Sequence, residues 1–150
     1  MRKHSTHYNI LLVEDDPDVR AMFQQILAAE GYCVALARTG RQALAAIRDA
    51  EFQLVISDLS LPDADGTELV EQIRAAAPDT GVLAISGFMA GMSRSALLAA
   101  GATDTLAKPA SPRKLIGCVR VLLDAQFAPE TNANTSDRPG YLVACGAGSA

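Results

Sequence analysis

The chain has 150 residues, of which 49% are hydrophobic and 20% charged, and it carries a formal net charge of −4. This length suffices for one domain with a complete core, and the composition is ordinary for a globular protein. The sequence contains no membrane-length apolar run, no signal-peptide core and no long basic run. We therefore expect a cytoplasmic protein that neither spans a membrane nor binds nucleic acid directly. The three widely spaced cysteines, Cys33, Cys118 and Cys145, are expected to be free thiols.

The first half of the chain alternates apolar runs typical of strands with amphipathic stretches typical of helices. The strand-like runs cover residues 9–13, 32–37 and 54–58, and the third ends at a carboxylate. Asp16-Pro17 and Thr39-Gly40 each predict the start of a helix. The inward face predicted for the first helix, which stops at Gly31, consists of Val19, Met22, Phe23, Ile26 and Leu27.

The second half continues the alternation. It predicts a helix over 66–77, a strand over 81–86, a glycine-flanked loop over 87–91 that is able to move, and a helix ending at Gly101. A strand over 103–107 and a helix starting at Ser111-Pro112 complete the pattern. Five strand-helix units predict an α/β fold with a doubly wound, five-stranded parallel sheet. We expect a folded domain over 8–127, a flexible N-terminus over 1–7 and a disordered, polar tail over 128–150.

Charged or hydroxyl side chains lie at the ends of four predicted strands. Glu14 and Asp15 follow the first strand, Asp58 ends the third, Ser86 ends the fourth and Lys108 follows the fifth. Because the carboxyl ends of parallel strands share one edge of a sheet, these side chains are expected to converge there. Three carboxylates and one ammonium leave a charge of −2, which recruits a divalent cation or raises a carboxylate pKa. Oxygen ligands favour Mg²⁺, with Mn²⁺ as the alternative, and such a site predicts phosphoryl chemistry with Asp58 as the nucleophile.

The motifs at these strand ends resemble the receiver domain of bacterial two-component response regulators over about residues 8–126. They are Val-Glu-Asp-Asp-Pro, Ser-Asp-Leu-Ser-Leu-Pro-Asp-Ala-Asp-Gly, Ile-Ser-Gly and Lys-Pro. The resemblance implies a flavodoxin-like sheet with strand order 2-1-3-4-5. It also implies that Asp58 accepts a phosphoryl group from a phosphohistidine of a sensor histidine kinase or a histidine phosphotransfer protein. Such a protein catalyses only its own phosphorylation and dephosphorylation and is not otherwise an enzyme.

The resemblance assigns a role to each residue of the cluster. Asp15 and Asp58 would bind Mg²⁺ directly, Glu14 would bind it through water, and the backbone carbonyl of Ser60 would complete the protein ligands. Lys108 would pair with the Asp58 carboxylate and then with the phosphate.

The resemblance also predicts how the site signals. The bond between Lys108 and Pro109 is expected to be cis. Ser86 would donate to a phosphate oxygen, and its movement with the following loop is the expected switch. Thr105 stands where the family often has an aromatic residue, so rotation of a large ring is not expected. The signal would pass to a protein target through the fourth helix, fifth strand and fifth helix, with little response over 40–50.

Several alternatives are open at this point. The chain could be a phosphorelay intermediate, the receiver portion of a hybrid kinase or of a transcription regulator, or a homodimer. A haloacid-dehalogenase-like phosphatase would need a second acid at the position of Ser60. A flavodoxin would need a phosphate-binding loop where Glu14, Asp15 and Asp16 repel phosphate. A degenerate receiver could serve only as a docking module, but here the acids and the lysine of the site are intact.

Overall fold

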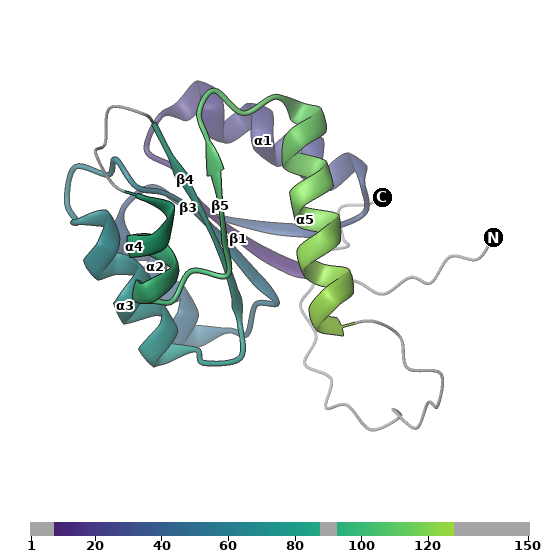
Figure 1. Cartoon of the computed structure of the whole chain (residues 1–150). Helices are drawn as coiled ribbons and strands as arrows, with labels where there is room; N and C mark the ends of the chain where they lie inside the picture. Colours follow the sequence, from purple (N-terminus) through teal and green to yellow (C-terminus); the bar gives the residue numbers. More distant parts are fainter. Residues whose placement is uncertain (1–7, 88–92, 128–150) are drawn as a thin grey trace, which may run out of the picture.

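The computed structural model describes residues 8–87 and 93–127 and contains alternating strands and helices (Figure 1). Their order is β1 (Asn9–Val13), α1 (Pro17–Ala29), β2 (Cys33–Ala37), α2 (Gly40–Asp49), β3 (Leu54–Asp58), α3 (Gly66–Ala76), β4 (Gly81–Ser86), α4 (Arg94–Ala100), β5 (Asp104–Ala107) and α5 (Pro112–Phe127). β2 and β5 begin one residue later than predicted and α3 ends one residue earlier, which is the usual uncertainty of element ends. No helix of the described part is long and apolar enough to cross a membrane.

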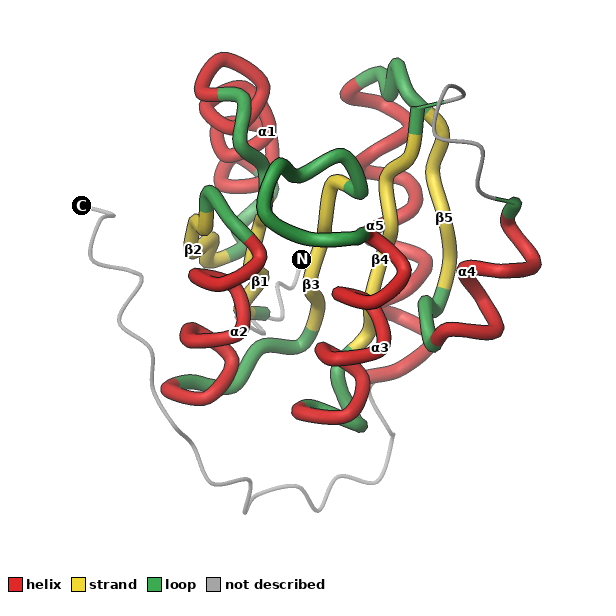
Figure 2. Tube along the Cα trace, turned by 90° about the vertical axis from the view of Figure 1, so that its left-hand side faces the viewer, coloured by secondary structure: helices red, strands yellow, loops and turns green. Residues whose placement is uncertain are grey.

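The strands form one parallel sheet in the order β2-β1-β3-β4-β5, as Figure 2 shows. Helices α1 and α5 cover one face of the sheet, and α2, α3 and α4 cover the other (Figure 1). The predicted fold class, a doubly wound, flavodoxin-like α/β domain with this strand order, is confirmed.

Burial on both faces explains why the central strands are mostly apolar. In β1, Ile10 and Leu12 pack with the core beneath α1 and α5, whereas Leu11 and Val13 pack with the core beneath the other helices. Successive side chains of a strand point to opposite faces, so a strand covered on both sides favours apolar residues throughout. Ser57 of β3 is buried as well, and its hydroxyl donates to the Asp58 carbonyl (3.3 Å). The other polar side chains are displaced to the strand ends, where the candidate site lies.

The predicted helix signals act as local caps. The Asp16 carboxylate accepts hydrogen bonds from the backbone N–H groups of Asp18 (2.9 Å) and Val19 (3.3 Å) at the start of α1. The Thr39 hydroxyl accepts one from the Gln42 N–H (3.0 Å) at the start of α2. Beyond the end of α1, Gly31 has a φ of +97°, the left-handed conformation that glycine adopts without strain.

Met22 departs from the predicted inward face of α1. Phe23 and Leu27 are buried, but 43% of Met22 is exposed. Helical spacing placed Met22 beside the buried stripe, but the described sheet and α5 cover only the centre of that stripe. The interpretation of Met22 as a core residue is therefore wrong.

The expectation of free thiols is wrong at Cys33, which takes part in a disulfide bond. Cys33 begins the edge strand β2 and is only partly buried, so its sulfur is accessible to a second thiol. Cys118 is free and half-buried in α5. Cys145 lies outside the described residues.

Two glycine-to-alanine substitutions should change the free energy of unfolding in opposite directions. A Cβ at Gly66 would lie 2.8 Å from the Leu59 Cβ and 2.9 Å from the Leu59 carbonyl oxygen, whereas a Cβ at Gly117 meets nothing within 4 Å. We expect Gly66→Ala to destabilise the domain by about 1–3 kcal/mol through overpacking. Gly117→Ala should stabilise it by up to about 1 kcal/mol, because alanine favours the helix. Urea unfolding followed by circular dichroism in EDTA measures both, and equal stability of the two variants would contradict this packing.

Candidate functional site

The predicted site residues meet at the carboxyl-terminal edge of the sheet. Asp58 is the last residue of β3, Glu14 and Asp15 follow the neighbouring strand β1, and Lys108 follows β5. The chain separates Lys108 from Asp58 by 50 positions, but their side chains are in contact. The convergence expected from parallel strand order is therefore present.

Backbone hydrogen bonds extend the sheet beyond its strands and hold the residues of this edge. The Glu14 N–H donates to the Ala37 carbonyl (3.0 Å), and the Lys108 N–H donates to the Ser86 carbonyl (2.8 Å). The Leu59 N–H, directly after Asp58, donates to the Ile85 carbonyl (3.0 Å). Residues held by the sheet in this way have little freedom, so the side chains they carry are preorganised.

Both oxygens of the Asp58 carboxylate have hydrogen-bond partners. Lys108 Nζ donates to Oδ2 (2.9 Å), and the Ser60 backbone N–H donates to Oδ1 (3.0 Å). The Asp58 side chain is 3% exposed and the Lys108 side chain 34% exposed, so the ion pair opens to solvent on the lysine side. A charge-assisted bond of this kind is stronger than a neutral one. It offsets part of the cost of burying Asp58.

Three carboxylates form a group able to hold a metal ion. Glu14, Asp15 and Asp58 each offer an oxygen, and these atoms all lie within 4.8 Å of one another. Glu14 and Asp58 are buried, whereas Asp15 is exposed and leaves a side open to water. Hard oxygen donors with one open side fit a small divalent cation that retains water, such as Mg²⁺ or Mn²⁺.

Burial raises the pKa of the Glu14 carboxyl to about 7. A hydrogen bond that Glu14 accepts from the Asp16 N–H (3.1 Å) lowers this pKa. The negative charge of Asp58 and a hydrogen bond between the Glu14 and Asp58 side chains raise it further. Part of the predicted −2 charge is therefore relieved by a proton, which a cation would have to displace.

The two residues predicted to act in the switch lie on the neighbouring strands β4 and β5. Ser86 ends β4, is half-buried and pairs with Ala107, and Thr105 lies half-buried on β5 opposite Ala84. The bond between Lys108 and Pro109 is cis, the form expected for it. The loop predicted to move extends into residues 88–91, which lie outside the described residues. The roles of Ser86 and Thr105 stay predictions.

Sequence reasoning missed Arg20. Its Nη1 donates to the Glu14 carbonyl (2.9 Å) and the Asp15 carbonyl (3.3 Å), which holds the loop between β1 and α1. The available signal was a cationic residue one turn into α1, four positions after the cap Asp16.

An apolar groove beside Lys108 was also missed. It has a volume of about 400 Å³ and is lined by Val19, Met22, Phe23, Gly87, Lys108, Pro109 and Ala110. The exposed side chain of Met22 therefore forms part of a groove next to the ion pair between Asp58 and Lys108. Helical periodicity carried no information about this surface, which α1 and the β5–α5 loop form together.

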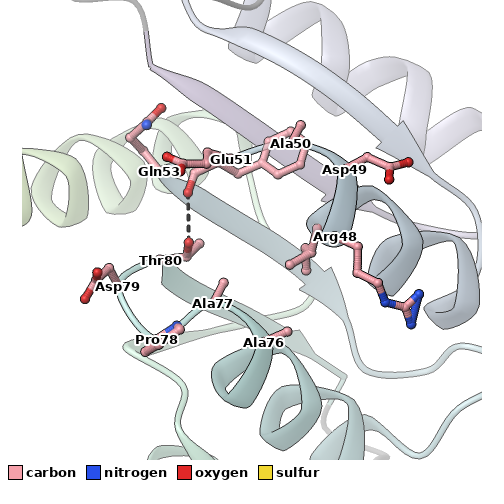
Figure 3. A pocket seen from close by; sticks show the side chains of 12 residues that line it. Arg48, Asp49, Ala50, Glu51, Gln53, Ala76, Ala77, Pro78, Asp79 and Thr80 are labelled. Carbon is pink, nitrogen blue, oxygen red and sulfur yellow. Dashed lines mark hydrogen bonds between the residues drawn. The ribbon is translucent and has the colours of Figure 1, made fainter. Parts of the chain in front are cut away.

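A second cavity, of about 520 Å³, lies at the opposite edge of the sheet, where α2 and α3 end (Figure 3). The Thr80 hydroxyl donates to the Phe52 carbonyl across it (2.9 Å). The side chains of Arg48 and Asp79 lie on opposite sides of it and point outward in Figure 3. We assign the chemistry to the other edge, where the charged groups converge.

Comparisons with known proteins agree with this geometry. Residues 10–120 match the response regulator receiver domain. The chain is 35% identical over 127 residues to the response regulator MprA of Mycolicibacterium vanbaalenii, a match that covers 85% of this chain and 54% of MprA. It is 38% identical over 106 residues to the transcriptional regulatory protein ZraR of Escherichia coli, covering 69% of this chain and 24% of ZraR. The chain thus spans about half, or less, of these curated relatives.

Solved structures show the same fold at similar identity. A CheY-like receiver domain protein from Methanospirillum hungatei has a TM-score of 0.75 at 35% identity, covering 81% of this chain and 97% of that one. The chemotaxis response regulator CheY4 of Vibrio cholerae has a TM-score of 0.72 at 32% identity, covering 79% of this chain and all of that one (100%).

The raised pKa of Glu14 predicts how stability depends on pH in the metal-free protein. The folded protein holds this proton up to about pH 7, whereas an unperturbed glutamate releases it near 4.5. Between these values the folded state binds more protons, so the contribution of Glu14 to the free energy of unfolding falls as pH rises. Glu14→Gln should therefore stabilise the protein in EDTA by on the order of 2 kcal/mol at pH 8 and much less at pH 5.

Thermal unfolding of the wild type and Glu14→Gln at the two pH values measures this difference. Glu71→Gln, which changes an exposed glutamate of α3, is the matched control and should show no such pH-dependent gain. A Glu14→Gln variant that gains equally at both pH values would contradict the raised pKa.

Proposed function

The chain belongs to the response regulator receiver domain family, and from that premise we propose that Asp58 accepts a phosphoryl group from a phosphohistidine. The donor is a sensor histidine kinase or a histidine phosphotransfer protein, and the reaction takes place in the cytoplasm. The observation that carries the proposal is the Asp58 carboxylate itself. It lies between Lys108 Nζ (2.9 Å) and the Ser60 N–H (3.0 Å), within 4.8 Å of the oxygens of Glu14 and Asp15.

The residues of the site suit a single phosphoryl transfer. An Asp58 oxygen attacks the phosphorus, the bond between phosphorus and the donor's imidazole nitrogen breaks, and an acyl phosphate forms on Asp58. Lys108 passes from the carboxylate to a phosphoryl oxygen, and the Ser86 hydroxyl donates to another. Both groups stabilise negative charge that grows on the transferred oxygens.

The three carboxylates would hold Mg²⁺, Asp15 and Asp58 directly and Glu14 through water, with the Ser60 carbonyl as a further ligand. When bound, the ion supplies positive charge that neutralises the carboxylates and the phosphoryl oxygens. Asp15 is the exposed member of the group, so it faces the side from which a phosphoryl group enters. Because the pKa of Glu14 is about 7, its proton would have to leave before an ionised Glu14 could accept hydrogen bonds from water on the ion.

We place the contact with the phosphodonor on the apolar groove beside Lys108. A histidine that reacts at Asp58 has to approach within bonding distance, so the surface around it must contact the rim of this edge. The groove offers Val19, Met22 and Pro109 next to the ion pair, and an amphipathic helix of the donor can bury apolar side chains there.

We place the outgoing signal on α4, β5 and α5. Leu98 and Val121 are exposed there (37% and 65%), which suits a protein contact. Arg74 of α3 holds the far end of α4 by donating to the Gly101 carbonyl through Nε (3.1 Å) and Nη2 (2.9 Å). With that end anchored, a displacement that starts at Ser86 should move the beginning of α4 more than its end.

The wider assignment is a proposal for the whole protein. MprA and ZraR are longer than the regions matched, and the name of ZraR describes a transcriptional regulatory protein. We propose that the receiver itself contacts protein and not nucleic acid. Any DNA binding, in a protein of this kind, would belong to a segment outside the receiver.

The phosphoacceptor assignment predicts a labile mass adduct. With acetyl phosphate and Mg²⁺, the intact protein should gain one phosphoryl group, and Asp58→Ala should not, because the nucleophile is removed. Leaving out Mg²⁺ should reduce labelling at least tenfold. Asp79→Ala, which changes an exposed acid at the opposite edge, is the control and should label like the wild type. Labelling of Asp58→Ala at the wild-type level would exclude Asp58.

The docking assignment predicts that a substitution in the groove slows phosphoryl transfer from a protein donor but not from a small-molecule donor. Met22→Glu places a charge in the apolar groove, so transfer from a phosphohistidine protein should slow by about tenfold or more. Labelling by acetyl phosphate should remain within about twofold, because a small donor does not need the groove. Val121→Glu, at an exposed position on α5, is the matched control. Equal loss with both donors would show that Met22 supports the site and not the docking surface.

A further inference from the structure

The loop between β3 and α3, which follows Asp58, is tied to the start of α2 by Asp63. Asp63 Oδ1 accepts a hydrogen bond from the Gly40 N–H (2.9 Å), and Oδ2 accepts one from the Arg41 N–H (3.2 Å). The partners lie 23 and 22 positions earlier in the chain. Figure 2 shows this loop extending toward the start of α2 before it enters α3.

Asp63 completes the capping of α2. The first N–H groups of a helix have no partner within the helix, and the local cap Thr39 satisfies only that of Gln42 (3.0 Å). The carboxylate of Asp63 accepts hydrogen bonds from the N–H groups of Gly40 and Arg41, and its negative charge lies at the positive end of the helix dipole. The hydrogen bond from Gly40 is the main cause of a lowered pKa at Asp63.

Close packing limits the freedom of the same loop. A Cβ at Gly40 would lie 2.9 Å from the Ala64 Cβ, so the start of α2 is in contact with the loop without a gap. At the other end, the Leu59 N–H is held by the Ile85 carbonyl (3.0 Å). Ser60 lies between these two attachments, and its N–H donates to Asp58 Oδ1 (3.0 Å).

We propose that Asp63 is a positioning residue of the phosphoryl site. By fixing the loop on α2, it holds the Ser60 backbone where the N–H reaches Asp58 and where the carbonyl can serve a bound cation. The inference rests on the proposed function, because it concerns the same site. It goes further in linking the site to α2, for which the sequence predicted little response over 40–50.

The link must act in both directions. If the hold of Asp63 on α2 favours the loop arrangement that binds a cation, then cation and phosphoryl mimic must in turn favour the bonds to Gly40 and Arg41. The proposal thus differs from the expectation of little change over 40–50. The first turn of α2 should respond to occupancy of the site, and its later turns should not.

The test compares three variants for Mg²⁺ affinity by titration calorimetry of the unphosphorylated protein. Asp63→Ala removes both hydrogen bonds and should weaken Mg²⁺ binding roughly fivefold or more. Asp63→Asn loses the charge but keeps one acceptor oxygen, so its loss should be smaller. Thr39→Ala removes a cap from the same helix end without touching the loop and should bind Mg²⁺ within about twofold of the wild type.

The outcomes separate positioning from simpler effects. Equal losses in Asp63→Ala and Thr39→Ala would mean that Asp63 only stabilises α2, and the proposal would be wrong. Equal losses in Asp63→Ala and Asp63→Asn that disappear at high salt would mean a long-range charge effect, which also overturns it. A wild type that binds neither Mg²⁺ nor beryllofluoride would instead refute the proposed function.

Amide hydrogen exchange gives a second readout. In the wild type, beryllofluoride with Mg²⁺ should slow exchange in peptides covering 38–43. In Asp63→Ala this change should vanish, while the change in peptides covering Asp58 persists. Protection of 38–43 by beryllofluoride in Asp63→Ala as strong as in the wild type would overturn the link.

Discussion

Two buried carboxyl groups, Glu14 and Asp58, lie together at one edge of the sheet. The rest of the site compensates the free-energy cost of burying them side by side. Burying like charges side by side is unfavourable unless protons, cations or hydrogen bonds compensate them. Lys108 and the Ser60 N–H compensate Asp58, and a proton held to about pH 7 compensates Glu14. A site that keeps this much negative charge in a small volume is prepared for a divalent cation, which would replace the proton.

The sheet supplies the rigidity that such a site needs. The N–H groups of Glu14, Leu59 and Lys108 all donate to neighbouring strands beyond the regular ladder. The side chains of Glu14, Asp58 and Lys108 are therefore carried by backbone positions that the sheet holds. Reorganisation during the proposed phosphoryl transfer can then be confined to the side chains of Lys108 and Ser86.

Side-chain bonds to backbone groups of distant turns connect elements at both edges of the sheet, Asp63 at the edge of the site and Arg74 at the opposite edge. Asp63 joins the loop after Asp58 to the start of α2, and Arg74 joins α3 to the end of α4. Arg74 also donates to the carbonyls of Pro78 (2.8 Å) and Thr80 (2.7 Å), so one guanidinium holds two turns together. Of these, the Asp63 bonds provide an attachment through which a change at Asp58 can reach α2, whereas the Arg74 bonds hold the far end of α4 in place.

The sequence alone determined the order of elements, the strand order through the family resemblance, and the meeting of Glu14, Asp58 and Lys108. The order of elements follows from alternation in buried strands and from caps such as Asp16 and Thr39, and the meeting of the three side chains follows from the shared edge of parallel strand ends. Each rule involves residues within a few positions or the topology of the whole sheet, so no detailed packing had to be known.

Only the tertiary structure decided the exposure of Met22, the depth and pKa of Glu14, and the bonds from Asp63 to the first turn of α2. Helical spacing shows which side chains share a face, but the width of the buried stripe depends on what packs against it. A pKa depends on the desolvation of one carboxyl at its final depth. The partner of Asp63 lies 23 positions earlier, and a hydrogen bond across that separation exists only once two loops are packed together.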